Sequence, residues 1–177
     1  MNYRNNYNNY NNRNNNKPGP RQNDSLILMS IMTYYARQIF DGTKGFEFRK
    51  SPLRASDLNK QIFVYSAKGD KAIIGSFKVS KIHHGNVDQI MQITGYDKRP
   101  DGHEILEYYG NNPNCYALEL YDVQTFPKPL TLKELRRLDP NVQLPQYFTY
   151  INPSSPIYKQ VKALNKQLTQ SEPGEMQ

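Results

Sequence analysis

The stretch that decides the fold is GTKGFEFR, residues 42–49. It follows apolar residues at helical spacing, so Gly42 is expected to end a helix and Lys44 to lead into a strand. Alternate side chains of a strand share a face, which places Glu47 and Arg49 on the same side. Three charges facing one surface are costly to bury unless they pair or meet a polar ligand. These three charged residues are therefore the candidate site.

Hydrophobic patterns on both sides of this octet predict further elements. The apolar run 26–31 indicates a buried strand, and Thr33 is placed to cap the helix that follows it. Strands are expected at 44–49, 62–67, 71–82 and 115–123, and an aromatic extended segment is expected at 145–150. Helices are expected at 87–93 and in the segments that start near residues 101, 131 and 156. This mixed order predicts an α+β domain: a small β-barrel, a mostly antiparallel, curled sheet flanked by helices.

Three helix starts carry recognisable signals. Asp101 with Glu104, and Thr131 with Glu134, have the spacing of a capping box. Pro156 is placed at the first helical position of a last amphipathic helix that continues to residue 168.

The composition predicts four segments. Residues 1–24 are an Asn-rich, low-complexity tail with a Pro/Gly linker, and without aliphatic residues in its first 16 positions this tail is expected to be disordered. The folded domain is expected at 25–152, followed by a C-terminal amphipathic helix at 153–168. Residues 169–177 are expected to be a second disordered tail.

The overall charge and the cysteine content restrict partners and location. The formal net charge of +7 over 177 residues points to an anionic partner, with nucleic acid first. The single cysteine, Cys115, cannot form an internal disulfide, which favours a reducing compartment. No apolar run reaches the length of a membrane span. We expect an intracellular protein, cytoplasmic or, in a eukaryote, nuclear, with no membrane partner.

The histidines do not form a metal-binding pattern. His83 and His84 are adjacent on a predicted strand and therefore point to opposite faces, while His103 and Cys115 stand apart without ligand spacing. We expect no metal and no cofactor.

The octet also carries a resemblance. Gly42, Lys44, Glu47 and Arg49 match the G-x-K-x-x-E-x-R signature of the ASCH family, within the PUA-like β-barrel superfamily. The segments 28–41, 74–79, 116–135 and 145–148 resemble further blocks of that family in the same order, so the match spans about residues 26–152. The resemblance implies a small barrel with a cleft between the first helix and the sheet. It also implies binding of RNA or other nucleic acid, with links to transcription and translation.

The octet predicts how such a ligand is held. Arg49 is suited to a bidentate bond with a phosphate or a base edge, Glu47 can accept from an exocyclic amine, and Lys44 supplies charge. Tyr65, on a strand expected to flank the octet, and Phe46 behind it are the candidate stacking surfaces. The alternative is a structural ion pair on one strand face. The ligand hypothesis requires that the three charges line one open, concave surface beside an aromatic residue.

Two other functions remain as alternatives. A subset of the family, as the resemblance implies, hydrolyses N4-acetylcytidine-type nucleosides with a lysine, a threonine three residues later and a downstream acid. This chain keeps Lys44 but has Glu47 at the threonine position, and the acid would be Asp97 or Asp101. An enzyme here would be an amidohydrolase or a nuclease; we expect a recognition site instead. The second alternative is a protein-interaction module.

Overall fold

A computed structural model describes residues 24–169, so the predicted tails at 1–24 and 169–177 lie outside the described residues except for their innermost positions. One six-stranded sheet, in the order β2-β5-β4-β3-β1-β6, forms the body of the protein. Its strands are β1 Leu26–Met32, β2 Phe46–Arg49, β3 Gln61–Ala67, β4 Ala72–Gly85, β5 Cys115–Thr131 and β6 Phe148–Ile151. Strands β1 and β3 are parallel, and the other neighbours are antiparallel. The mostly antiparallel sheet is therefore confirmed.

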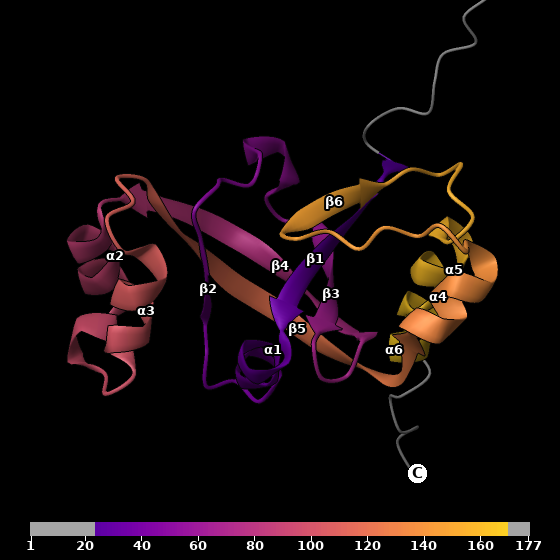
Figure 1. Cartoon of the computed structure of the whole chain (residues 1–177), viewed down its shortest axis with the longest axis horizontal. Helices are drawn as coiled ribbons and strands as arrows, with labels where there is room; N and C mark the ends of the chain where they lie inside the picture. The colour runs from indigo at the N-terminus through magenta and orange to yellow at the C-terminus, as the bar shows by residue number, and fades with distance from the viewer. Residues whose placement is uncertain (1–23, 170–177) are drawn as a thin grey trace, which may run out of the picture.

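Five of the six helices of residues 24–169 lie at the two ends of this sheet (Figure 1). Helices α2 and α3 lie at one end, and α4, α5 and α6 lie at the other (Figure 1). The helices are α1 Thr33–Phe40, α2 Val87–Thr94, α3 Gly102–Tyr109, α4 Leu132–Leu138, α5 Tyr158–Ala163 and α6 Asn165–Thr169, with 3-10 turns at Ala55–Asp57 and Tyr96–Lys98. No helix of residues 24–169 is long and apolar enough to cross a membrane. The α+β class with flanking helices is confirmed.

The sheet curls into a half-barrel rather than a closed barrel. The register shifts between β3 and β4 and at three places between β4 and β5, and such bulges increase twist and bend the strands. The curl brings β2 opposite β1, although three strands separate them in the sheet order. The Arg49 guanidinium on β2 donates to the Ser30 carbonyl on β1 at 3.0 Å. A side chain thus bridges the open side, where the described strands have no backbone pairing between β2 and β1.

Helix α1 packs closely on the middle of the sheet because of one glycine. A Cβ atom at Gly75 would lie 2.4 Å from the Gln124 carbonyl oxygen and 2.4 Å from the Phe40 ring. Any other residue would force β5 or α1 away from β4. This close approach helps to fix the position of α1 and of the turn to β2 that follows it.

Three hydrophobic clusters fill the structure. One lies between the sheet and α1, and a second joins α2 and α3 to β2 and β5. The third joins β3 and β5 to the C-terminal helices, where Val161 and Leu164 are buried in the same cluster as Phe63 and Phe126. Residues beyond 152 thus pack against the sheet.

Several local predictions were wrong in detail. Thr33 is the first residue of α1 and does not cap it; its hydroxyl instead donates to the Ala67 carbonyl at 2.6 Å, which ties the helix start to β3. Asp101 precedes α3 without a side-chain cap, because its carboxylate pairs with Arg99 at 2.8 Å. The capping box of Thr131 and Glu134 does form.

Two predicted boundaries also move. Strand β5 continues to Thr131, because Asp122, at φ +50°, forms a bulge instead of an end. The last helix begins at Tyr158 and divides around Leu164 into α5 and α6. Pro156 therefore precedes the helix and is not its first residue.

Candidate functional site

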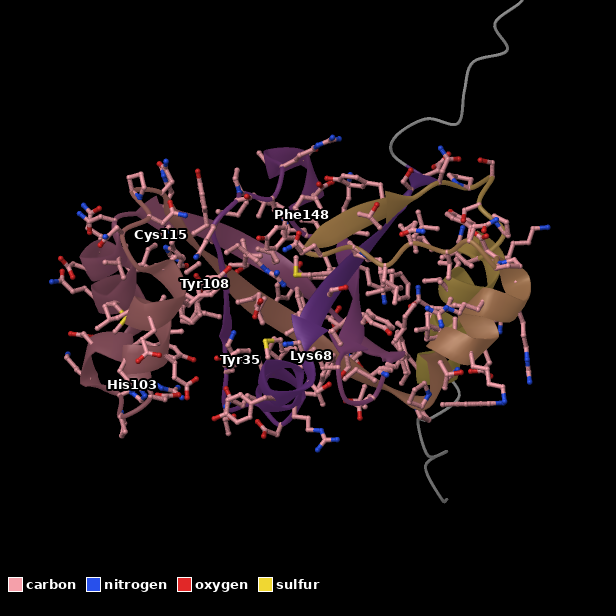
Figure 2. The ribbon with its side chains drawn as sticks, in the orientation of Figure 1. Tyr35, Lys68, His103, Tyr108, Cys115 and Phe148 are labelled. Carbon is pink, nitrogen blue, oxygen red and sulfur yellow. The ribbon has the colours of Figure 1, made fainter. Side chains whose placement is uncertain are left out.

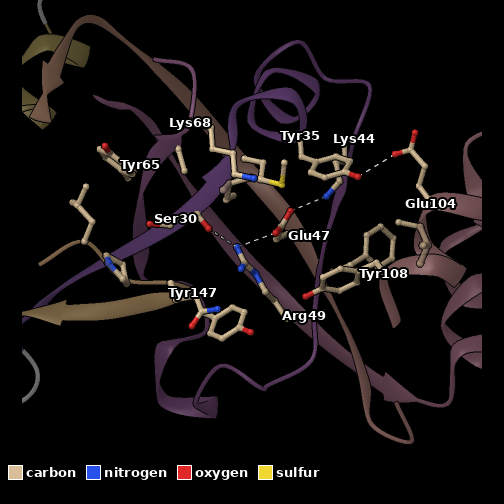
Figure 3. A pocket seen from close by; sticks show the side chains of 18 residues that line it. Ser30, Tyr35, Lys44, Glu47, Arg49, Tyr65, Lys68, Glu104, Tyr108 and Tyr147 are labelled. Carbon is tan, nitrogen blue, oxygen red and sulfur yellow. Dashed lines mark hydrogen bonds and ion pairs between the residues drawn. The ribbon is translucent and has the colours of Figure 1, made fainter. Parts of the chain in front are cut away.

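A cavity of about 390 Å³ opens where the curled sheet faces α1 and α3 (Figure 3). The octet supplies one wall, since Lys44, Glu47 and Arg49 all line the cavity. Strands β1 and β3 supply a second wall. Residues 144–147 supply a third, and the Ser30 N–H fixes this segment by donating to the Tyr147 carbonyl at 2.9 Å. The cavity is therefore assembled from segments far apart in the sequence.

The three octet charges form one buried chain of contacts. Lys44 Nζ lies 2.7 Å from Glu47 Oε2, and Arg49 Nη2 lies 2.9 Å from Glu47 Oε1. The three residues are only 5%, 6% and 8% exposed. Each carboxylate oxygen thus holds one cation, and Glu47 bridges the lysine to the arginine. We call this set the charged triad.

The charged triad keeps Glu47 ionised. Burial alone would raise the pKa of its carboxyl group, because a charge is poorly solvated away from water. The charges of Lys44 and Arg49, with the hydrogen bond from Lys44, outweigh that effect and hold the pKa below its ordinary value. The triad is therefore a preorganised arrangement of two cations and one anion.

Tyrosines supply much of the remaining cavity surface. Tyr35, Tyr65, Tyr108 and Tyr147 all line it, and Tyr147 is 45% exposed at the rim. Lys44 Nζ lies 5.5 Å from the centre of the Tyr35 ring, within cation–π range. Burial is the main cause that raises the pKa of the Tyr35 and Tyr108 hydroxyls above its ordinary value.

Solved structures similar to this chain include three of one bacterial protein. The ASCH protein of Zymomonas mobilis is 24% identical with a TM-score of 0.65, over 84% of this chain and 96% of that one. A tyrosine-to-phenylalanine variant of it is 26% identical with a TM-score of 0.66, over 77% and 96%. A serine-to-alanine variant is 26% identical with a TM-score of 0.66, over 81% and 97%.

This chain has the fold of the ASCH domain. No protein-family model matches it, and neither does any curated protein. The G-x-K-x-x-E-x-R signature of the ASCH domain occupies the turn and strand that carry the charged triad, so the motif and the cavity coincide.

The ASCH cavity contains only part of the predicted residue set. Tyr65 lines it, whereas Phe46 does not: its ring packs 6.0 Å from His83, on the other side of β2. Asp97 and Asp101 are also outside the lining. The acid downstream of the octet that lines the cavity is Glu104 of α3, whose Oε2 accepts a hydrogen bond from the Tyr35 hydroxyl at 3.2 Å.

Lys68, Glu104 and the side chains of 144–146 were not predicted as site residues. Glu104 stood out in the sequence only for its capping spacing. Lys68 belongs to the turn between β3 and β4, where it adopts φ +72° and lies at the cavity. The P-Q-Y-F block at 145–148 was the one available signal for the third wall.

Two polar atoms at the cavity walls have unused hydrogen-bonding capacity. Ser30 Oγ and Arg49 Nε are buried and have no partner among residues 24–169. Buried polar groups in native proteins are nearly always hydrogen-bonded. Their location in two residues that line the cavity is consistent with a polar ligand or water at this site.

The ASCH cavity does not present a lysine-activated hydroxyl. Lys44 Nζ bonds to the Glu47 carboxylate, and the Thr43 hydroxyl is turned toward Asp41 Oδ1 at 2.6 Å and the Gln38 carbonyl at 3.2 Å. A carboxylate at position 47 cannot serve as the hydroxyl nucleophile of an acyl transfer. Lys44 and Thr43 therefore do not form the lysine–hydroxyl pair of the hydrolase arrangement.

Metal-ligating side chains do not converge within residues 24–169, where no group of three or more His, Cys, Asp or Glu is placed to hold an ion. His83 pairs with Glu119 at 2.9 Å. His103 and Cys115 lie toward the α2–α3 end of the molecule, away from Lys68 (Figure 2).

Proposed function

We propose that this ASCH domain binds nucleic acid, with one base of single-stranded RNA, or a modified nucleotide, held in the cavity. One observation carries the proposal: the 390 Å³ cavity combines tyrosine rings with the charged triad. Ligand sites of this size typically pair an apolar lining with a few fixed polar groups. Proteins that read unpaired bases use aromatic rings for stacking and polar groups for the base edge.

The balance of charge favours a base rather than a phosphate inside the cavity. Lys44, Arg49 and Lys68 contribute positive charge, but the carboxylates of Glu47 and Glu104 share the same lining. A phosphate would meet repulsion from both carboxylates. A base is neutral and offers donors and acceptors side by side, which matches a lining that alternates cations and anions.

The charge of the whole chain supports a polyanionic partner. Its net charge is +7, and the ASCH resemblance implies RNA or another nucleic acid. The proposed setting is regulation of transcription or translation, as the same resemblance implies.

Tyr147 offers a direct test, because it lines the cavity and yet is 45% exposed. We expect Tyr147→Ala to weaken binding of fluorescein-labelled single-stranded RNA about 5- to 150-fold, since stacking contributes about 1–3 kcal/mol per base. Fluorescence anisotropy of the full-length protein measures the change.

Tyr121→Ala is the matched control for this experiment. Tyr121 is 38% exposed on β5 and lies outside the cavity lining. The control should bind RNA as the unmodified protein does. Equal affinity of the two variants would remove the cavity from the proposal.

A further inference from the structure

A patch of exposed positive charge surrounds the start of α4. Lys71, Lys133, Arg136 and Arg137 line one shallow depression, and all four are exposed. None of the four forms an ion pair with a described residue, whereas Lys60, Lys78 and Arg99 elsewhere on the surface do. We call these four residues the basic face.

The nearby carboxylates leave the basic face positive. Asp70 lines the same depression, but it pairs with Arg37 at 3.2 Å. Glu134 accepts hydrogen bonds from the N–H and the hydroxyl of Thr131 in the capping box. The four cations therefore face solvent without an ion pair to a described carboxylate, although the charge of Arg137 also acts on Glu134.

The basic face begins where the cavity ends. Residues 68–71 form the turn between β3 and β4: Lys68 lines the cavity and Lys71 lines the depression. The Lys71 carbonyl accepts the Leu132 N–H at 2.8 Å, which holds the first turn of α4 against this loop.

A second connection runs through the core. Tyr65 of the cavity packs in the same hydrophobic cluster as Leu135 of α4. The positive charge of Arg136 is close enough to act on the Tyr65 hydroxyl and oppose the rise that burial causes in its pKa. The cavity and the basic face are thus neighbouring parts of one surface.

We propose that a single-stranded nucleic acid whose base occupies the cavity continues over the β3–β4 turn onto the basic face, where its phosphates meet Lys71, Lys133, Arg136 and Arg137. This inference rests on the proposed function. It divides the binding between two regions: the cavity takes one base, and the basic face takes the backbone. A strand with separate phosphates fits cations spread over a turn and a helix, and it also explains why the basic face adjoins a cavity.

The test compares two lengths of RNA with two triple variants of the full-length protein. The first variant is Lys133→Gln, Arg136→Gln, Arg137→Gln. The second is Lys81→Gln, Lys98→Gln, Lys159→Gln, which removes three exposed lysines that line neither region. Both variants keep the basic residues of the first 23 positions, so the comparison isolates the basic face.

We expect the first variant to bind a single-stranded dodecamer at least about tenfold more weakly at low salt. The slope of log affinity against log salt should become shallower by about 2, at about 0.7 for each phosphate that the variant no longer neutralises. Binding of a dinucleotide should stay unchanged. The control variant should keep most of the dodecamer affinity. It should also prefer the dodecamer to the dinucleotide as strongly as the unmodified protein does.

The outcomes separate this inference from the proposed function. If Tyr147→Ala weakens binding of both RNAs but the two triple variants behave alike, the basic face is not the path and the inference is wrong. If Tyr147→Ala has no effect, the proposed function itself fails. Binding to anionic phosphatidylserine vesicles that the first triple variant abolishes, with no change in dodecamer binding, would assign the basic face to a membrane and overturn the inference.

Discussion

The charged triad and the basic face use the same residue types in opposite ways. In the triad, two cations are buried and share one carboxylate at 2.7 and 2.9 Å. On the basic face, four cations are exposed and have no ion pair with any described residue. Buried pairs fix geometry, because any displacement leaves a charge unsolvated, whereas exposed cations bind polyanions over a wide range of positions. Under the proposed function, the triad provides selectivity and the basic face provides affinity.

The largest expected effect comes from breaking the triad. Glu47→Gln removes the charge that Lys44 and Arg49 share and places an NH₂ donor against one of the two cations. We expect the free energy of unfolding to fall by about 3–5 kcal/mol, as is typical when one partner of a buried ion pair is lost. Urea denaturation measures the change.

Asp122→Asn is the control for this prediction. Asp122 pairs with Lys78 at 2.8 Å on the surface, and asparagine tolerates its φ of +50°. An exposed pair of this kind contributes about 0–1 kcal/mol. Similar losses in the two variants would show that burial does not distinguish the triad from a surface pair.

Acid should remove part of the same contribution. The pKa of Glu47 is lowered in the folded protein, so its stabilisation is present above the ordinary value of 4.5 and is lost as the pH falls through the lower folded value. The unmodified protein should therefore lose stability below about pH 4.5, and the gap between it and Glu47→Gln should narrow. Urea denaturation at pH 7 and at a series of acidic pH values measures that gap; a constant gap would contradict the prediction.

The smallest effect is expected at the start of α4. Thr131→Ala removes the hydroxyl that caps this helix, and we expect the free energy of unfolding to fall by about 1 kcal/mol. Dinucleotide binding should not change, because the cavity does not include this residue. Thr131→Ser keeps the hydroxyl and should restore the stability; if it does not, the capping bond is not the cause.

Much of the fold and part of the site could be predicted from the sequence, because local rules determine them. The period of two in residues 44–49 correctly placed Glu47 and Arg49 on one face. The same rule argues against Phe46, which alternates with Glu47 and packs beside His83. Phe46 was included in the predicted site because its ring is aromatic, although the alternation of the strand places it on the opposite face from Glu47.

The remaining site residues depend on tertiary structure. Glu104 reaches the cavity because α3 packs against β2 and β5, and Lys68 reaches it because the sheet curls. Neither the packing of α3 nor the curl of the sheet can be predicted from the residues next to Glu104 or Lys68 in the sequence. Likewise, the break in the last helix at Leu164 follows no local signal, since the apolar stripe continues through it.

The position of β1 in the sheet determines when the sheet can be completed during translation. This strand lies between β3 and β6, so its outer edge stays open until Phe148–Ile151 have left the ribosome. The third wall of the cavity, residues 144–147, emerges immediately before that strand. A nascent chain that already carries the complete octet therefore still lacks the third wall of the cavity. The cavity is therefore complete only when nearly the whole domain has been translated.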